Sequence, residues 1–103
     1  MGITQTNTGS VVEVELEGDF TIASSTQLKD ELFRAFASGQ NIRVSLERVG
    51  VLDITAIQLL WAAAREAELT EHSLTIAHPI PEPILACIRE AGIPFPSLLE
   101  ATI

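Results

Sequence analysis

The spacing of hydrophobic and polar residues predicts two strands at the start of the chain. In residues 10–17, three valine or leucine side chains alternate with three glutamates (Val12, Val14, Leu16; Glu13, Glu15, Glu17). Such alternation is typical of a strand with one face on the core and one in water. Residues 3–6 read as a shorter strand, and the turn-prone Asn7-Thr8-Gly9 joins the two.

A helical period replaces the strand pattern after a predicted break at residues 18–21. Ser24 and Gln27 have capping-box spacing, so a helix is expected to begin near Ser24. Gly39 is well placed to end it. The buried stripe of this helix is predicted to comprise Leu28, Leu32, Ala35 and Phe36.

Strand and helix patterns then alternate to the end of the chain. Residues 42–46 predict a third strand, and a loop at residues 49–55 opens into a long helix that ends near Leu69. Its apolar stripe is Ile57, Leu60, Trp61 and Ala64. Leu74 and Ile76 mark a fourth strand, and proline-rich residues 78–83 lead to a helix over residues 83–91. The tail, residues 97–103, is expected to pack Leu98 and Leu99 on the core.

This order predicts one α/β domain over residues 1–103, with a mixed four- to five-stranded sheet and helices mainly on one face. Strands separated by helical crossovers pair in parallel. In open α/β sheets, functional sites form beyond the carboxyl ends of the strands. Residues 18–21, 49–55 and 77–79 meet that condition, so Asp19 and Thr21 are expected on the same edge as Asp53 and Thr55.

Composition narrows the classes of partner. The chain has 103 residues, enough for a single core, and 47% of them are hydrophobic. The net charge of −8 repels phosphate backbones and so disfavours nucleic acid. No apolar run reaches the length of a membrane span, and no signal pattern opens the chain. The single cysteine excludes an intrachain disulfide, which fits a reducing cytoplasm; we expect a cytoplasmic protein without direct membrane insertion.

The motifs expected of an enzyme or of a cofactor-binding protein are not found in the sequence. The only histidines are His72 and His78, which with the isolated Cys87 do not make a metal site. Cys87 lies between Ala86 and Ile88 and is expected to be a buried apolar residue. None of the glycines forms a phosphate-binding loop. Two carboxylates at one loop edge, Asp19 and Asp53, are a weak signal for an acid–base pair.

Thr55 is the residue with the most distinctive position. Its hydroxyl is predicted at or just before the first turn of the long helix, where unpaired N–H groups and the helix dipole favour negative charge. Asp53 or Thr55 can serve there simply as the N-cap. Alternatively, Thr55 can accept a phosphoryl group, which the same N–H groups would hold. Both interpretations place Thr55 at an exposed helix start.

Three segments together resemble a known family. Residues 16–22 (Leu-Glu-Gly-Asp-Phe-Thr-Ile), residues 44–46 (Val-Ser-Leu) and residues 52–60 (Leu-Asp-Ile-Thr-Ala-Ile-Gln-Leu-Leu) are similar to those of STAS domains. This is the fold shared by bacterial anti-sigma-factor antagonists and the cytoplasmic tails of sulphate transporters. The resemblance covers roughly residues 10–99, and the predicted element order agrees with it.

The resemblance implies a partner switch controlled by phosphorylation. In the antagonists, a loop of the type Asp-Ser-Ser-Gly opens the second helix and its third residue is phosphorylated. Asp53 and Thr55 stand at the aspartate and phosphoacceptor positions. The implied partner is a histidine-kinase-like anti-sigma factor or serine kinase, released when phosphate adds charge to the interface. The implied contact residues are Asp19, Phe20, Thr21, Asp53, Ile54, Ala56, Ile57, Gln58 and His78.

The loop also departs from the antagonist pattern and supports a second hypothesis. Ile54 replaces a hydroxyl residue, Thr55 replaces serine and Ala56 replaces glycine. The sequence is similar to the Asp-Thr-Ala-Gly-Leu-Gln-Leu-Leu type of STAS proteins in chemotaxis-like clusters and phospholipid-transport ABC systems. In the latter, a small STAS subunit binds the ATPase without phosphorylation. Ile54 and Ile57 near an exposed helix start would suit such a permanent contact.

Overall fold

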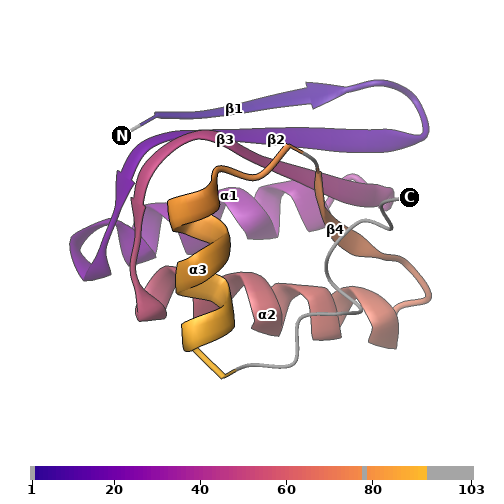
Figure 1. Cartoon of the computed structure of the whole chain (residues 1–103). Coiled ribbons are helices and arrows are strands. Elements are labelled where there is room, and N and C mark those ends of the chain that lie inside the picture. Colours follow the sequence, from indigo (N-terminus) through magenta and orange to yellow (C-terminus); the bar gives the residue numbers. More distant parts are fainter. Residues whose placement is uncertain (1, 78, 93–103) are drawn as a thin grey trace.

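A four-stranded sheet forms one layer of the molecule, and the helices lie beneath it in the view of Figure 1. The computed structural model describes residues 2–77 and 79–92. The strand order is β1-β2-β3-β4, in which β1 pairs with β2 antiparallel and the other two pairs are parallel. The strands are β1 (Gly2–Asn7), β2 (Val11–Phe20), β3 (Asn41–Leu52) and β4 (Leu74–Ala77).

Helices α1 (Ser25–Phe36) and α2 (Ile54–Leu69) connect the parallel strands, as the sequence predicts, and a third helix, α3 (Glu82–Glu90), follows the last strand. The 3-10 turn η1 (Ile22–Ser24) precedes α1. Because each crossover carries a helix, β2, β3 and β4 run in the same direction and end at the same edge. The predicted single α/β domain with a mixed sheet and helices on one face is confirmed.

The core lies between the sheet and the helices. On β2, Val14, Leu16 and Phe20 are completely buried, whereas the intervening glutamates are exposed on the open face of the sheet. The helices contribute the apolar side of each amphipathic surface, including Leu28 of α1, Leu60 of α2 and Ile84 of α3. Burying this face fixes the register of each strand, since a shift by one residue would turn glutamates inward.

Two strands are longer than the sequence predicts. Residues 18–20 continue β2, and residues 49–52 continue β3 instead of forming a loop. The parallel pairing of β2 with β3 continues to the ends of both strands and contains two register shifts. One lies between Glu15 and Glu17 of β2, and the other between Gly18 and Asp19. The extra residues lie on β3, so its inward and outward alternation changes phase twice. As a result, Val49 and Leu52 are buried and Val51 is exposed.

Local details of the helices also differ from the predictions. The capping box at Ser24 does not form: its hydroxyl makes no cap hydrogen bond, and Thr21 instead caps η1 by accepting the Ala23 N–H at 3.3 Å. Phe36 and Trp61 are only partly buried. Cys87, predicted to be buried, is exposed, because the inward face of α3 is formed by Ile84 and Ile88. The packing predicted for residues 97–103 lies outside the described residues.

Candidate functional site

The end of β2, the end of β3 and the start of α2 meet at one edge of the molecule, as predicted. Asp19 pairs with Val51 and Phe20 pairs with Leu52 in the parallel ladder. The next residue, Asp53, donates its N–H to the carbonyl oxygen of Phe20 at 3.0 Å. This edge lies on the left of Figure 1, at the amino end of α2.

Asp53 is the N-cap of α2. Its backbone is extended (φ −83°, ψ 174°), and its Oδ1 accepts the N–H of Ala56 at 3.1 Å. Its carbonyl oxygen accepts the N–H of Ile57 at 3.0 Å, which closes the first turn. Of the two capping alternatives, the aspartate therefore takes the role, which leaves Thr55 as the second residue of the helix.

Replacing Asp53 with alanine is expected to lower the free energy of unfolding by about 1 kcal/mol, since the N–H of Ala56 loses its acceptor. Urea unfolding followed by circular dichroism measures the change. Asp53→Asn keeps a side-chain acceptor and is the matched control, with little loss expected. Equal destabilisation by the two substitutions would show that the capping bond does not stabilise the helix.

Thr55 is half-buried on the first turn of α2. Among the described residues, no group forms a hydrogen bond with its hydroxyl. The first backbone N–H groups of the helix also lack intrahelical acceptors, as at every helix start. Capping by Asp53 thus leaves the Thr55 hydroxyl available, but less exposed than the sequence suggests.

Asp19 lies over the bulged part of β3. A Cβ atom built on Gly50 would come within 2.9 Å of the Asp19 Oδ1, so the glycine leaves space in which this carboxylate sits. The backbone carbonyl of Asp19 accepts a weak hydrogen bond from the Ser24 hydroxyl at 3.4 Å. This close approach places the Asp19 carboxylate beside the last residues of β3. The prediction that these segments share one edge requires this position.

Exposed apolar side chains surround these polar groups. Ile22 is 71% exposed, Val51 is 45% exposed and Ile54 is 49% exposed. Ile22 belongs to η1, which contacts α2, and Val51 points outward because of the bulges in β3. Sequence reasoning missed Ile22 and Val51, since neither belongs to a predicted strand or helix whose period would indicate which way its side chain faces. We call the surface formed by Asp19, Ile22, Val51, Asp53, Ile54, Thr55 and Gln58 the α2 edge.

Three of the predicted contact residues have side chains that lie in the core. Phe20, Ala56 and Ile57 are buried, so a role for them in partner binding stays a prediction. Each faces inward because the end of β2 and the first turn of α2 close over the same apolar layer. Asp19, Ile54 and Gln58 are exposed, while Thr21 and Asp53 are half-buried. His78 lies outside the described residues.

A hollow of about 250 Å³ borders the α2 edge on the side of α3. Ile54 and Ile57 of α2 form one wall, and Cys87, Glu90 and Ala91 lie on the other. The exposed thiol and Glu90 were not among the predicted site residues, because only the packing of α3 brings them here. The hollow extends the apolar surface beyond Ile54.

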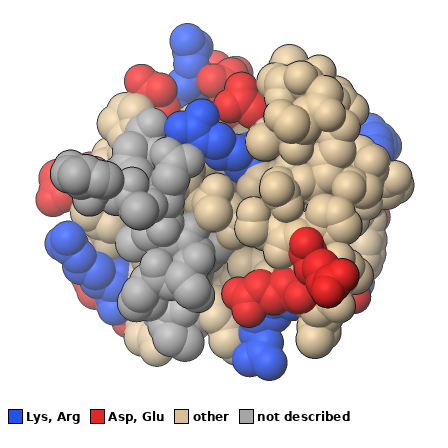
Figure 2. Space-filling view, turned by 90° about the vertical axis from the view of Figure 1, so that its right-hand side faces the viewer, with Lys and Arg blue, Asp and Glu red and all other residues tan. Residues whose placement is uncertain are grey.

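The opposite edge of the molecule has a different character. It carries the β1–β2 turn and the carboxyl ends of α1 and α2, and Figure 2 views it directly. Charged side chains of both signs lie around its margin beside a broad uncharged area.

No helix of residues 2–77 and 79–92 has the length and apolar character needed to cross a bilayer. The same residues contain no group of three potential metal ligands.

Comparisons with known proteins relate this geometry to a family. The model of the family described as "Mlab, STAS domain" matches residues 3–94. The structure is similar to that of the anti-sigma factor antagonist SpoIIAA in its unphosphorylated form, with a TM-score of 0.72 and 17% identity over 99% of this chain and 90% of that one. The phosphorylated form of SpoIIAA, a Bacillus cell fate determinant, gives a TM-score of 0.70 at 17% identity over 98% and 92%.

A third similar structure is that of Mglu, with a TM-score of 0.64 and 17% identity. The match covers 74% of this chain but only 19% of the Mglu chain. At these identities the structural matches show the fold alone. A search of curated proteins finds no match.

Proposed function

The chain belongs to the STAS domain family, and we propose that it is a non-enzymatic regulatory module that binds a protein partner through the α2 edge and is switched by phosphorylation of Thr55. The observation that carries the proposal is the position of Thr55. Its unbonded hydroxyl lies on the first turn of α2, among exposed apolar side chains and next to a capping aspartate. The working location of such a module is the cytoplasm.

The apolar residues of the α2 edge support the binding part of the proposal. Ile22, Val51 and Ile54 expose much of their side chains in the isolated chain. Apolar surface gains free energy when a partner removes it from water. The partner therefore gains free energy mainly by covering these apolar side chains.

Electrostatics supports the switching part. A phosphothreonine carries about −1.5 to −2 charges at neutral pH. On Thr55 this charge would stand two residues from the Asp53 carboxylate, within a surface whose partner contacts are apolar. Burying two neighbouring negative groups without a cation costs more free energy than the apolar contact returns. The unmodified chain is therefore the form expected to bind the partner.

When the chain is incubated with its cognate kinase and ATP, the wild type is expected to gain one phosphate and the Thr55→Ala variant none. Mass spectrometry of the intact chain and of its peptides measures the addition. Thr26→Ala is the matched control, because Thr26 is the second residue of α1, as Thr55 is of α2, and is exposed. Phosphate on Thr26, or elsewhere than Thr55, would contradict the switch.

A constitutive subunit of a transport or signalling assembly is the second candidate. Two observations favour it: Thr55 is half-buried, and the matching family model is the one described as Mlab. In this case the same edge binds an ATPase of the ABC type, and Ile54 is a permanent contact. Co-purification with that ATPase that is unchanged by Thr55→Glu distinguishes this candidate from the switch.

A further inference from the structure

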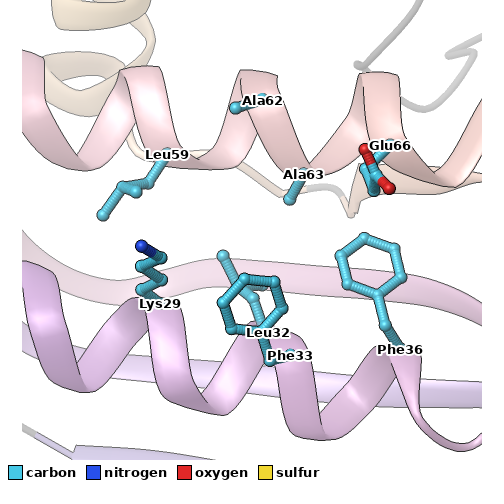
Figure 3. A pocket seen from close by; sticks show the side chains of 8 residues that line it. All are labelled: Lys29, Leu32, Phe33, Phe36, Leu59, Ala62, Ala63 and Glu66. Atoms are coloured by element: carbon cyan, nitrogen blue, oxygen red, sulfur yellow. The ribbon is translucent and has the colours of Figure 1, made fainter.

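The outer side of the two long helices contains a second apolar surface, separate from the α2 edge. A groove of about 210 Å³ runs between α1 and α2 (Figure 3). Leu32, Phe33 and Phe36 of α1 line one side, and Leu59, Ala62 and Ala63 of α2 line the other. The alanines make the α2 wall low, whereas the Phe33 ring protrudes and is 58% exposed.

The two ends of the groove carry opposite charges. Lys29 lies at one end, opposite Leu59, and Glu66 lies at the other, opposite Phe36 (Figure 3). Both side chains are exposed, and neither has an ion-pair partner among the described residues. The Lys29 ammonium lies 5.7 Å from the centre of the Phe33 ring, an approach that favours the cation only weakly at an exposed site.

The helix layer is also the part of the surface best suited to meet a copy of itself. The whole chain has 14 acidic and 6 basic residues, but α1 and α2 together carry four acidic and three basic ones. The rest of the acidic excess lies outside these two helices, and the exposed glutamates on the open face of the sheet are partly balanced by Arg43 and Arg48. Two copies that meet through α1 and α2 therefore avoid most of the mutual repulsion.

From the opposite charges at the ends of this groove and its exposed apolar lining, we propose that α1 and α2 form a two-fold interface with a second copy of the chain. In a two-fold interface the same patch is used by both copies. An axis that places Lys29 of one copy against Glu66 of the other also forms the reciprocal pair. The same axis brings each protruding Phe33 over the low alanine wall of the opposite groove, where both rings are removed from water.

Charge reversal tests this arrangement in solution. Light scattering after size exclusion, over a concentration series, is expected to show the wild type approaching twice the 11.1 kDa mass of one chain. Lys29→Glu and Glu66→Lys are each expected to stay monomeric at concentrations where the wild type is dimeric, because each creates two like-charge pairs. An equimolar mixture of the two variants is expected to restore the dimer, since each then supplies the charge that the other lacks.

The controls separate a specific interface from general charge effects. Glu66→Lys makes the chain less acidic, so a general effect would strengthen association in this variant, whereas the proposed pairing predicts its loss. Arg89→Glu on α3 makes the same charge change as Lys29→Glu away from the groove and is expected to dimerise like the wild type. Circular dichroism verifies that each variant is folded. A wild type that stays monomeric, variants that still dimerise, or a mixture that stays monomeric would overturn the proposal.

Discussion

Replacing Phe20 with alanine is expected to lower the free energy of unfolding by about 3–5 kcal/mol. The ring is completely buried at the end of β2, and the Phe20 carbonyl accepts the N–H of Asp53 at 3.0 Å. The substitution thus opens a cavity in the core at the end of β2. Small domains have a free energy of unfolding of about 5–15 kcal/mol, so the substitution is expected to remove a large part of it. Urea unfolding at several temperatures measures the loss.

Phe33→Ala is the matched control, since it removes the same ring from an exposed position. In dilute protein its cost is expected to stay within about 0.5 kcal/mol, because the ring is not buried in the monomer and alanine is the better helix former. A similar loss for both variants would mean that Phe20 does not anchor this edge of the core.

Replacing Ile54 with aspartate is expected to weaken partner binding by at least about 2 kcal/mol, or roughly 30-fold in Kd. The side chain is 49% exposed on the first residue of α2, so a partner that covers the α2 edge must bury it. An aspartate there would have to lose its water without a guaranteed cation. Folding should be preserved, because a negative group is favoured at a helix start. Calorimetric titration with the partner of the wild type provides the measurement.

Leu69→Asp offers the same change at the other end of α2. Leu69 is 78% exposed at the last position of the helix, and its substitution is expected to leave partner affinity unchanged. If Leu69→Asp weakened binding and Ile54→Asp did not, the contact surface would lie at the carboxyl end of α2. Made with the unmodified chain, this comparison tests the binding surface under both candidate functions.

The regular parts of the fold could be predicted because each side chain there follows its local period. The alternation around Val14 and the helical spacing around Leu60 correctly identify a strand and a helix and their buried faces. The order of these elements then requires parallel pairing, and parallel pairing places Asp19 near Asp53. The shared edge was therefore predictable without coordinates.

The bulged segment of β3 could not be predicted in this way. Its two extra residues interrupt the period of two, so residues 49–52 read as a loop although they are paired with β2. The exposure of Val51 is a consequence of that pairing and has no signature in its own sequence. The exposed Cys87 illustrates the same limit on a helix, where packing against the sheet selected Ile84 and Ile88 as the inward face.

Short-range spacing was enough to predict the α/β order, the edge on which the polar loops meet, and a threonine two residues after an aspartate at a helix start. Tertiary structure decided that Asp53 rather than Thr55 caps the helix, that Phe20, Ala56 and Ile57 are buried, and that Ile22 and Val51 complete the edge. The physical reason is that capping and exposure depend on which distant segments pack together, and local periodicity carries no information about those contacts.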